Sequence, residues 1–160
     1  MSYIQKSLGD GETIIARAHF HWLYVTAAWL CLLVPGVLVL ATMNQAQSQP
    51  DPYTVAAGLL FLLGLIIFLR MMIRKWSVEI GVTSHRFVEK YGLLSMKTNE
   101  IALPNIEGVR VNQSILGKIF GYGTVRIEGT GVDSVTTPTI ADPVGFVRAI
   151  QTAKEHVAGR

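Results

Sequence analysis

Charge is scarce in this sequence of 160 residues: Asp, Glu, Lys and Arg together make up 16% of it, whereas half of the residues are hydrophobic. Cysteine is scarcer still, because Cys31 stands alone. A single cysteine gives no support to an internal disulfide or to a thiolate cluster for a metal ion. The mean hydropathy of +0.39 is too high for an ordinary soluble domain of this size. The missing charge therefore points to long apolar segments and to a membrane protein.

Two long segments lack charge. Residues 22–43 and 53–69 contain no Asp, Glu, Lys or Arg, and three more apolar residues follow Arg70. About 20 helical residues span a hydrocarbon core of roughly 30 Å. We therefore predict a transmembrane hairpin: a helix over 22–43, an external loop over 44–54, and a second helix with its basic flank over 55–75. A cleaved signal sequence is the alternative for the first segment, but its apolar stretch exceeds the usual 7–15 residues.

Positive charges flank the two apolar segments on the side away from their connection. Lys6 and Arg17 precede the first segment, three cations follow the second, and the connecting loop has no Lys or Arg. Because Lys and Arg concentrate on the cytoplasmic side, we predict that both termini are cytoplasmic and that the loop is external. Amphipathic aromatic residues near the ends of the segments favour the interface. The predicted membrane-interface and lipid-contacting residues are Arg70, Arg74, Lys75, Trp22, Tyr53 and Trp76.

The net charge of +3 and the isoelectric point of about 9.2 raise the question of nucleic-acid binding. From residue 76 onward, nine Lys and Arg are balanced by eight Asp and Glu, and no basic stripe stands out. The surplus of positive charge belongs to the flanks of the apolar segments, where Lys and Arg favour anionic lipid headgroups. We therefore expect membrane lipids as partners and no nucleic acid.

The rest of the chain has the short alternating segments of an antiparallel sheet. Residues 76–83 predict a half-buried strand whose even-numbered residues face the core. In a later strand we expect Gly108 to form a bulge and Val109 and Val111 to point inward, whereas Pro138 confines the last strand to an edge. The further predicted strands cover residues 86–92, 97–103, 106–111, 124–128 and 134–140.

The final segment changes to helical spacing. Asp142 is a good N-cap and Pro143 a good first helical residue. Apolar residues then recur on one side of a helix, at Phe146, Val147, Ile150, Ala153 and Val157. We expect this amphipathic helix to close one side of the sheet. Residues 12–20 are a candidate for one more strand, which would place residues 1–21 in the same cytoplasmic domain as residues 76–160.

The stretch "SILGKIFGYGTVRI", residues 114–127, raises the question of a phosphate-binding loop. Gly117 and Lys118 are followed by Ile119, where a nucleotide-binding loop needs Ser or Thr, and the dinucleotide pattern fails as well. We instead expect a single helical turn over 114–120, with its side chains at positions 115, 119 and 120 capping the open end of the sheet. Gly121 and Gly123 then supply turn conformations.

Several residues of this part form a pattern. They are Thr83 and Arg86, then Tyr91 to Leu94, Glu100, Ile101, Leu103, Ile106 and Val109, and the central Gln113-Ser114, Leu116-Gly117, Phe120-Gly121 and Gly123, followed by Val125 and Asp142-Pro143. In these residues the chain resembles the bacterial pleckstrin-homology-like (PH-like) membrane proteins, over about residues 76–153. The resemblance implies an α+β fold, with a bent antiparallel barrel or sandwich of about seven strands and a C-terminal helix that plugs one open end. It also implies a place in the bacterial cytoplasmic membrane. The residues that we assign to structural turns are Gly92, Gln113, Ser114, Gly117, Gly121, Gly123 and Pro143.

The histidines do not complete a reactive site. His19 and His21 would share one face of a strand, but two imidazoles are fewer than the usual three or four metal ligands. Ser84 and His85 have no convincing carboxylate partner for a catalytic triad. We therefore expect no catalytic residue, no metal ion, no cofactor and no small-molecule substrate.

The favoured function is non-enzymatic protein–protein interaction or scaffolding at the cytoplasmic face, as a homo-oligomer or with another membrane protein. An antiparallel sheet held near the bilayer offers strand edges for such a partner. The alternative is a domain that binds anionic lipid headgroups, through Arg70, Arg74 and Lys75 together with Arg86 or Lys90. An enzyme is the third and least favoured reading.

Overall fold

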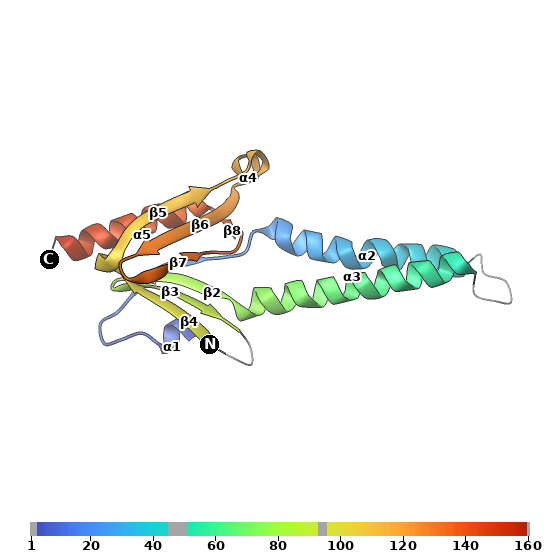
Figure 1. Cartoon of the computed structure of the whole chain (residues 1–160), viewed down its shortest axis with the longest axis horizontal. Coiled ribbons are helices and arrows are strands. Elements are labelled where there is room, and N and C mark those ends of the chain that lie inside the picture. The colour runs from blue at the N-terminus through green and yellow to red at the C-terminus, as the bar shows by residue number, and fades with distance from the viewer. Residues whose placement is uncertain (1–2, 45–50, 93–95, 160) are drawn as a thin grey trace. The chain divides into compact units, whose positions relative to one another are not determined.

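The structure, a computed structural model, describes residues 3–44, 51–92 and 96–159 (Figure 1). The chain divides into two compact units. Residues 1–21 and 76–160 form the first, which we name the β unit, and residues 22–75 form the second, which we name the helical unit. The middle of the predicted external loop, residues 45–50, lies outside the described residues, as do Leu93 and Leu94 of the sequence pattern.

The helical unit contains α2 (Trp22–Met43) and α3 (Pro52–Ser77), except for the last two residues of α3, which belong to the β unit. Both helices are long and apolar enough to cross a membrane, and little of their most apolar stretches is buried, 6% and 11% respectively. Helix α3 continues through Trp76 and Ser77, so the strand that we predicted from residue 76 begins only at Glu79. No helix breaker separates residue 75 from residue 77, and cations in the last turn favour the negative end of the helix dipole. The first residues of the segment that we predicted as a strand are therefore helical.

The two helices of the helical unit pack through a glycine. A Cβ at Gly64 of α3 would lie well inside van der Waals contact of the carbonyl oxygen of Cys31 in α2. Pro35, four residues beyond Cys31, has no N–H group and cannot donate the helical hydrogen bond to that oxygen. The close approach of α3 therefore occurs where α2 has a proline and a carbonyl without its usual partner.

Among its described residues, the β unit contains eight strands in two antiparallel sheets. The first sheet has the order β1-β2-β3-β4, and the second has β5-β6-β7, with β8 paired to β6. Helix α4 stands at the far end of the β5–β6 hairpin, and α5 runs beside the sheets (Figure 1). The strands are β1 (Ile14–Ala18), β2 (Glu79–Thr83), β3 (Arg86–Tyr91), β4 (Lys97–Ala102), β5 (Ile106–Asn112), β6 (Tyr122–Gly129), β7 (Val132–Thr136) and β8 (Ile140–Ala141). The other elements are α1 (Tyr3–Lys6), the 3-10 helix η1 (Leu103–Asn105), α4 (Ile115–Phe120) and α5 (Pro143–Ala158).

The candidate strand over residues 12–20 is present as β1, which pairs with β2 in the register Ala18 to Ile80. Beyond β1, Phe20 forms a bridge with Ile140, and the N–H of Ala141 donates to the carbonyl of His19 at 2.9 Å. These contacts join the two sheets at one corner. The sheets are nevertheless not closed into a barrel in the part of the chain that the structure describes, so the barrel expectation was wrong. The predicted strand over 134–140 is divided into β7 and the two-residue β8, and the short β8 gives only a small junction.

Helix α5 supplies the middle of the core, as its spacing predicted. Asp142 accepts a hydrogen bond from the N–H of Gly145 at 2.9 Å, and Pro143 is the first helical residue. The Phe146 ring meets that of Phe87 edge to face, with centroids 6.5 Å apart. Ile150 is fully buried on the same helix face. The amphipathic helix and the α+β class are confirmed.

Two burial patterns differ from expectation. Strand β2 is buried on both faces, because Ile4 of α1 lies 2.9 Å from where a Cβ of Gly81 would stand and covers the outer face. In β5 the register shifts between Ile106 and Gly108, next to the expected bulge, but Val109 is only half-buried and Val111 is exposed. The second half of β5 therefore contributes little to the core.

Candidate functional site

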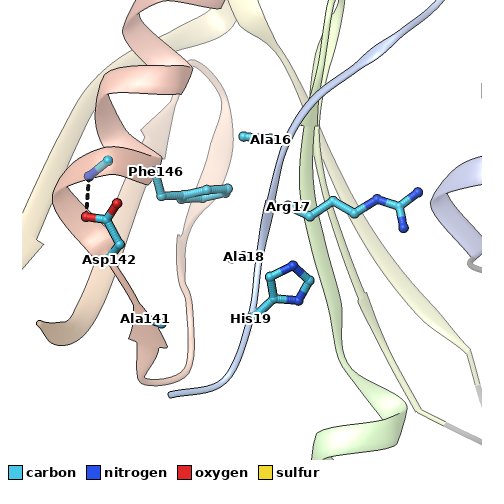
Figure 2. A pocket seen from close by; sticks show the side chains of 8 residues that line it. Ala16, Arg17, Ala18, His19, Ala141, Asp142 and Phe146 are labelled. Atoms are coloured by element: carbon cyan, nitrogen blue, oxygen red, sulfur yellow. Dashed lines mark hydrogen bonds between the residues drawn. The ribbon is translucent and has the colours of Figure 1, made fainter. Parts of the chain in front are cut away.

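A cleft of about 300 Å³ lies between β1 and the first turn of α5 (Figure 2). Ala16, Ala18 and Phe146 border it, and the carboxylate of Asp142 is turned toward the N–H of its own helix. Arg17 also borders the cleft, but its side chain extends away from Phe146 and Asp142 (Figure 2). The cleft is a small apolar space in which cationic and polar side chains do not converge on one point.

The paired histidines do not meet at a common point. His21 is buried, with its ring 5.3 Å from the ring of Tyr122, whereas His19 is exposed beside β1. Within residues 3–44, 51–92 and 96–159, no group of three or more His, Cys, Asp or Glu side chains has the arrangement of a metal site. Ser84 Oγ lies 2.9 Å from Nδ1 of His85 and also accepts a hydrogen bond from Thr13, so it fastens β1 to β2.

Arg86 lies at the centre of a polar cluster that includes the N-terminal segment. Its guanidinium donates to both carboxylate oxygens of Glu12, at 3.0 and 2.9 Å, and to the carbonyl of Ser7 at 2.6 Å. A further N–H donates to Glu100 at 2.8 Å, and the Thr83 hydroxyl donates to Glu12. Arg86, which we had considered as a headgroup contact, thus has four acceptors within its own chain, and we assign it a structural role.

The pKa values of Glu12 and Arg86 are shifted in the direction that keeps both side chains ionised. Burial is the largest single influence on Glu12 and pushes its pKa up, but hydrogen bonds from Gly9, Thr83 and Arg86 outweigh it and hold the pKa below its ordinary value of 4.5. The hydrogen bond to Glu12 is the main reason why the pKa of Arg86 is raised. The side chain of Glu12 is only 6% exposed, so its charge depends on Arg86.

The other cations that we singled out lie apart from this cluster. The ammonium of Lys90 stands over the ring of Tyr3, 5.4 Å from its centroid, and so joins β3 to α1. Arg74 and Lys75 belong to the last turn of α3, and Arg70 lies one turn earlier. The three interface aromatics Trp22, Tyr53 and Trp76 occupy helix ends and are exposed.

The glycine-rich stretch forms a fixed support for α4. Ser114 accepts a hydrogen bond from the N–H of Gly117 at 3.0 Å, and Gln113 donates to the carbonyls of Gly117 (3.3 Å) and Tyr122 (3.1 Å). A Cβ at Gly117 would lie 2.6 Å from the Tyr122 oxygen, and Gly121 adopts a φ of 75° as the C-cap. Both positions therefore require glycine. The polar residues of this stretch hold the two ends of one short helix together.

The remaining residues of the turn set are also structural, but Gly123 lies within β6 and has no positive φ, so the turn expected there was wrong. A Cβ at Gly123 would lie 2.7 Å from the carbonyl oxygen of Asn112, so β5 and β6 approach closely there. Gly92 has a φ of 93° directly after β3, and Pro143 begins α5.

Helix α4 does not cap the sheet, and that expectation was wrong. Its four large apolar side chains are strongly exposed: Ile115 by 81%, Leu116 by 57%, Ile119 by 69% and Phe120 by 48%. The helix that contributes buried side chains to the core is α5, through residues such as Phe146 and Ile150. We name these four side chains the α4 patch. The sequence correctly predicted that α4 is a helix. The hydrophobic residues of α4 did not indicate that they would lie outside the core.

Glu89 is a buried carboxylate that sequence reasoning missed. It pairs in register with Ile80 and Asn99, on the same face of β3 as the core residue Phe87, and it is 0% exposed. Neither of its oxygens accepts a hydrogen bond from a described residue. Burial raises the pKa of this carboxyl, and the nearby side chains of Tyr91 and Asn99 offset only part of the shift.

Replacing Glu89 with glutamine is expected to stabilise the β unit at pH 8 by about 1–2 kcal/mol. Burial of an ionised carboxylate costs free energy, and the neutral amide of glutamine avoids that cost. The folded pKa is raised, so between the unfolded pKa and the folded pKa the native state holds the extra proton. Wild-type stability is therefore highest at acid pH and falls as pH rises through the folded pKa. Urea unfolding at pH 5 and pH 8 measures this; Glu155→Gln, at an exposed position, is the control. Equal pH dependence in wild type and Glu89→Gln would contradict the assignment.

The fold and the two apolar helices together define a class, namely a PH-like α+β protein with candidate membrane spans. A family model described as "Bacterial PH domain" matches residues 21–153, which is most of the chain. The chain therefore belongs to the bacterial PH domain family, and the resemblance seen in the sequence is confirmed. No curated protein and no solved structure matches it.

Proposed function

We propose that this protein is a non-enzymatic, membrane-anchored interaction module, in which α2 and α3 cross the bilayer and the β unit binds protein at the cytoplasmic face. The observation that carries the anchoring is the exposure of apolar side chains all along both helices, for example Val37 (64%) and Leu59 (63%). Core helices of a soluble protein are mostly buried, whereas lipid is the natural environment for such surfaces. Arg70, Arg74 and Lys75 support a cytoplasmic location of the β unit, because they follow the second span.

The binding part of the proposal uses the edge of β4. This strand comes last in the order β1-β2-β3-β4, and no described strand pairs with its second side. Lys97, Asn99 and Ala102 are exposed along it. An extended segment from a partner, or from a second copy in an oligomer or membrane complex, can add to such an edge through main-chain hydrogen bonds.

Photo-crosslinking of the full-length protein in native membranes tests this proposal. A benzoylphenylalanine at Ala102, beside the open edge, is expected to form protein adducts that map to one segment of a partner or of a second copy. The same residue at Gln151, an exposed position on α5, is the matched control. The proposal is contradicted by lipid adducts alone, which would favour the headgroup-binding alternative, or by equal protein adducts at both positions. Extraction of the protein by alkaline carbonate would contradict the anchoring.

A further inference from the structure

We propose that the α4 patch inserts into the interface of the lipid bilayer and so docks the β unit against the membrane. This inference rests on the proposed membrane anchoring and adds to it a second, separate lipid contact. Ile115, Leu116, Ile119 and Phe120 expose between 48% and 81% of their surface on a helix of six residues. Soluble domains seldom gather large apolar side chains in this way without a binding role.

The patch is held in place by polar contacts and does not depend on core packing. Ser114 caps the first turn, and Gln113 holds both ends of the helix. A Cβ at Gly117 could not fit against Tyr122, so the support is closely packed. Helix α4 is therefore held in a fixed conformation, with its apolar side chains exposed.

The position of α4 within the β unit identifies lipid as the occupant. The ring of Tyr122, two residues after Phe120, lies 5.3 Å from that of His21, and Trp22 of α2 follows at once. The N–H of Asp142 donates to the carbonyl of Gly121, and the N–H of the preceding residue donates to the carbonyl of His19, both at 2.9 Å. Phe120 therefore lies close to the point where the chain leaves the β unit. The second crossing is at the same end, because Ile80, three residues after α3, pairs with Ala18. If α2 and α3 span the bilayer, the α4 patch is carried to its surface.

The charges on α4 and on the two strands that it connects fit an anionic bilayer surface. Lys118 stands within α4 itself. Arg110 and Arg126 form a cross-strand pair and share one carboxylate, Glu128, at 3.6 and 3.3 Å, so one positive charge remains in excess. Apolar side chains with cations around them are typical of elements that lie in the lipid interface.

Fluorescence quenching by spin-labelled lipid tests the inference in the full-length chain, reconstituted into vesicles of phosphatidylcholine and phosphatidylglycerol. In a Cys31→Ser background, the dye NBD is attached to a cysteine introduced by Ile119→Cys, Ile15→Cys or Leu33→Cys. Ile15 is an exposed apolar residue of β1, and the six residues from it to His21 span about 20 Å of extended chain. Leu33 lies in α2 and reports on anchoring alone.

A spin label near the lipid headgroups is expected to remove more than about half of the fluorescence at position 119 and little at position 15. A spin label near the bilayer centre is expected to quench position 33 most strongly. Quenching at 33 without quenching at 119 overturns this inference and leaves the anchoring intact, whereas no quenching at 33 overturns the anchoring itself. A blue-shifted but unquenched dye at 119 indicates burial against protein, such as a second copy, and also overturns the inference.

A double substitution tests whether quenching at position 119 depends on the apolar side chains of α4 or only on the position of α4 near the membrane. Leu116→Gln with Phe120→Gln, in the chain labelled at 119, is expected to reduce quenching to the level of position 15. Both side chains are exposed, so the β unit is expected to stay folded, which hydrogen exchange of β6 checks. Undiminished quenching would show that the linkers alone hold α4 near lipid, and would overturn a role for the patch.

Discussion

Replacing Arg86 with methionine is expected to lower the free energy of unfolding of the β unit by about 2–4 kcal/mol, because it leaves a buried carboxylate without its partner. Glu12 is 6% exposed, and Arg86 provides it with two charge-assisted hydrogen bonds. The same change also frees the carbonyl of Ser7 and so removes one of the links between β3 and the N-terminal segment. Hydrogen exchange of the amides of β2 and β3, in the full-length protein in detergent, measures the loss.

Arg110→Met is the matched control for this prediction. It removes the same charge and the same side chain, but Arg110 is 75% exposed and stands 3.6 Å from Glu128. Exposed ion pairs contribute little to stability, so this variant is expected to exchange like the wild type. Equal destabilisation by Arg86→Met and Arg110→Met would contradict the structural role of Arg86.

A double variant and a pH series examine the cause of the loss. Adding Glu12→Gln to Arg86→Met is expected to cost less than the sum of the single changes, since the unpaired charge disappears with it. The pKa of Glu12 is lowered in the folded protein, so its contribution is present above the unfolded pKa and is lost as pH falls through the folded pKa. The difference between wild type and Arg86→Met should therefore narrow as the pH falls below 4.5, the ordinary carboxyl pKa. Additive losses, or a constant difference across that range, would show that the ion pair is not the cause.

The parts of the fold that follow from local patterns could be predicted from the sequence. The alternation of Val125 and Ile127 gave β6, and Asp142 with Pro143 gave the start of α5. In each case the residues that determine the element lie within or beside it. The two apolar helices are equally local, because length and hydropathy alone define them.

The predictions that were wrong concern residues that contact segments far away in the chain. Gly81 was expected on an open face of β2, but Ile4 covers it. Arg86 was expected to be free to contact a lipid headgroup, but it binds Glu12, which lies 74 residues earlier in the chain. No periodicity within one segment contains that information.

The α4 patch could be predicted only in part from the sequence, for a similar reason. Ser114, Gly117 and Gly121 indicated a helical turn, and this turn is present as α4. Whether Ile119 faces the core or the solvent depends on which helix contributes side chains to the core. Phe146 of α5 belongs to the core, and the side chains of α4 are left outside.

The second large effect is expected in the helical unit, where Gly64→Val should force α2 and α3 apart. Overpacking of this kind costs about 1–3 kcal/mol in a core, and membrane helices rely on small residues for close approach. A β-branched side chain at position 64 would meet the carbonyl oxygen of Cys31, which belongs to the rigid backbone and cannot move as a flexible side chain can. The two helices must therefore separate.

Trp29 reports this separation, because its ring lies 5.0 Å from that of Phe68 on the other helix. We expect Gly64→Val to reach the midpoint of its Trp29 fluorescence change at a lower fraction of SDS in mixed micelles, in a background in which Trp22 and Trp76 are replaced by phenylalanine. Gly58→Val is the control, since nothing lies within 4 Å of a Cβ at that position of α3. It adds the same side chain to the same helix and should leave the midpoint unchanged. Equal shifts in the two variants would mean that helix propensity, and not the contact with Cys31, accounts for the loss.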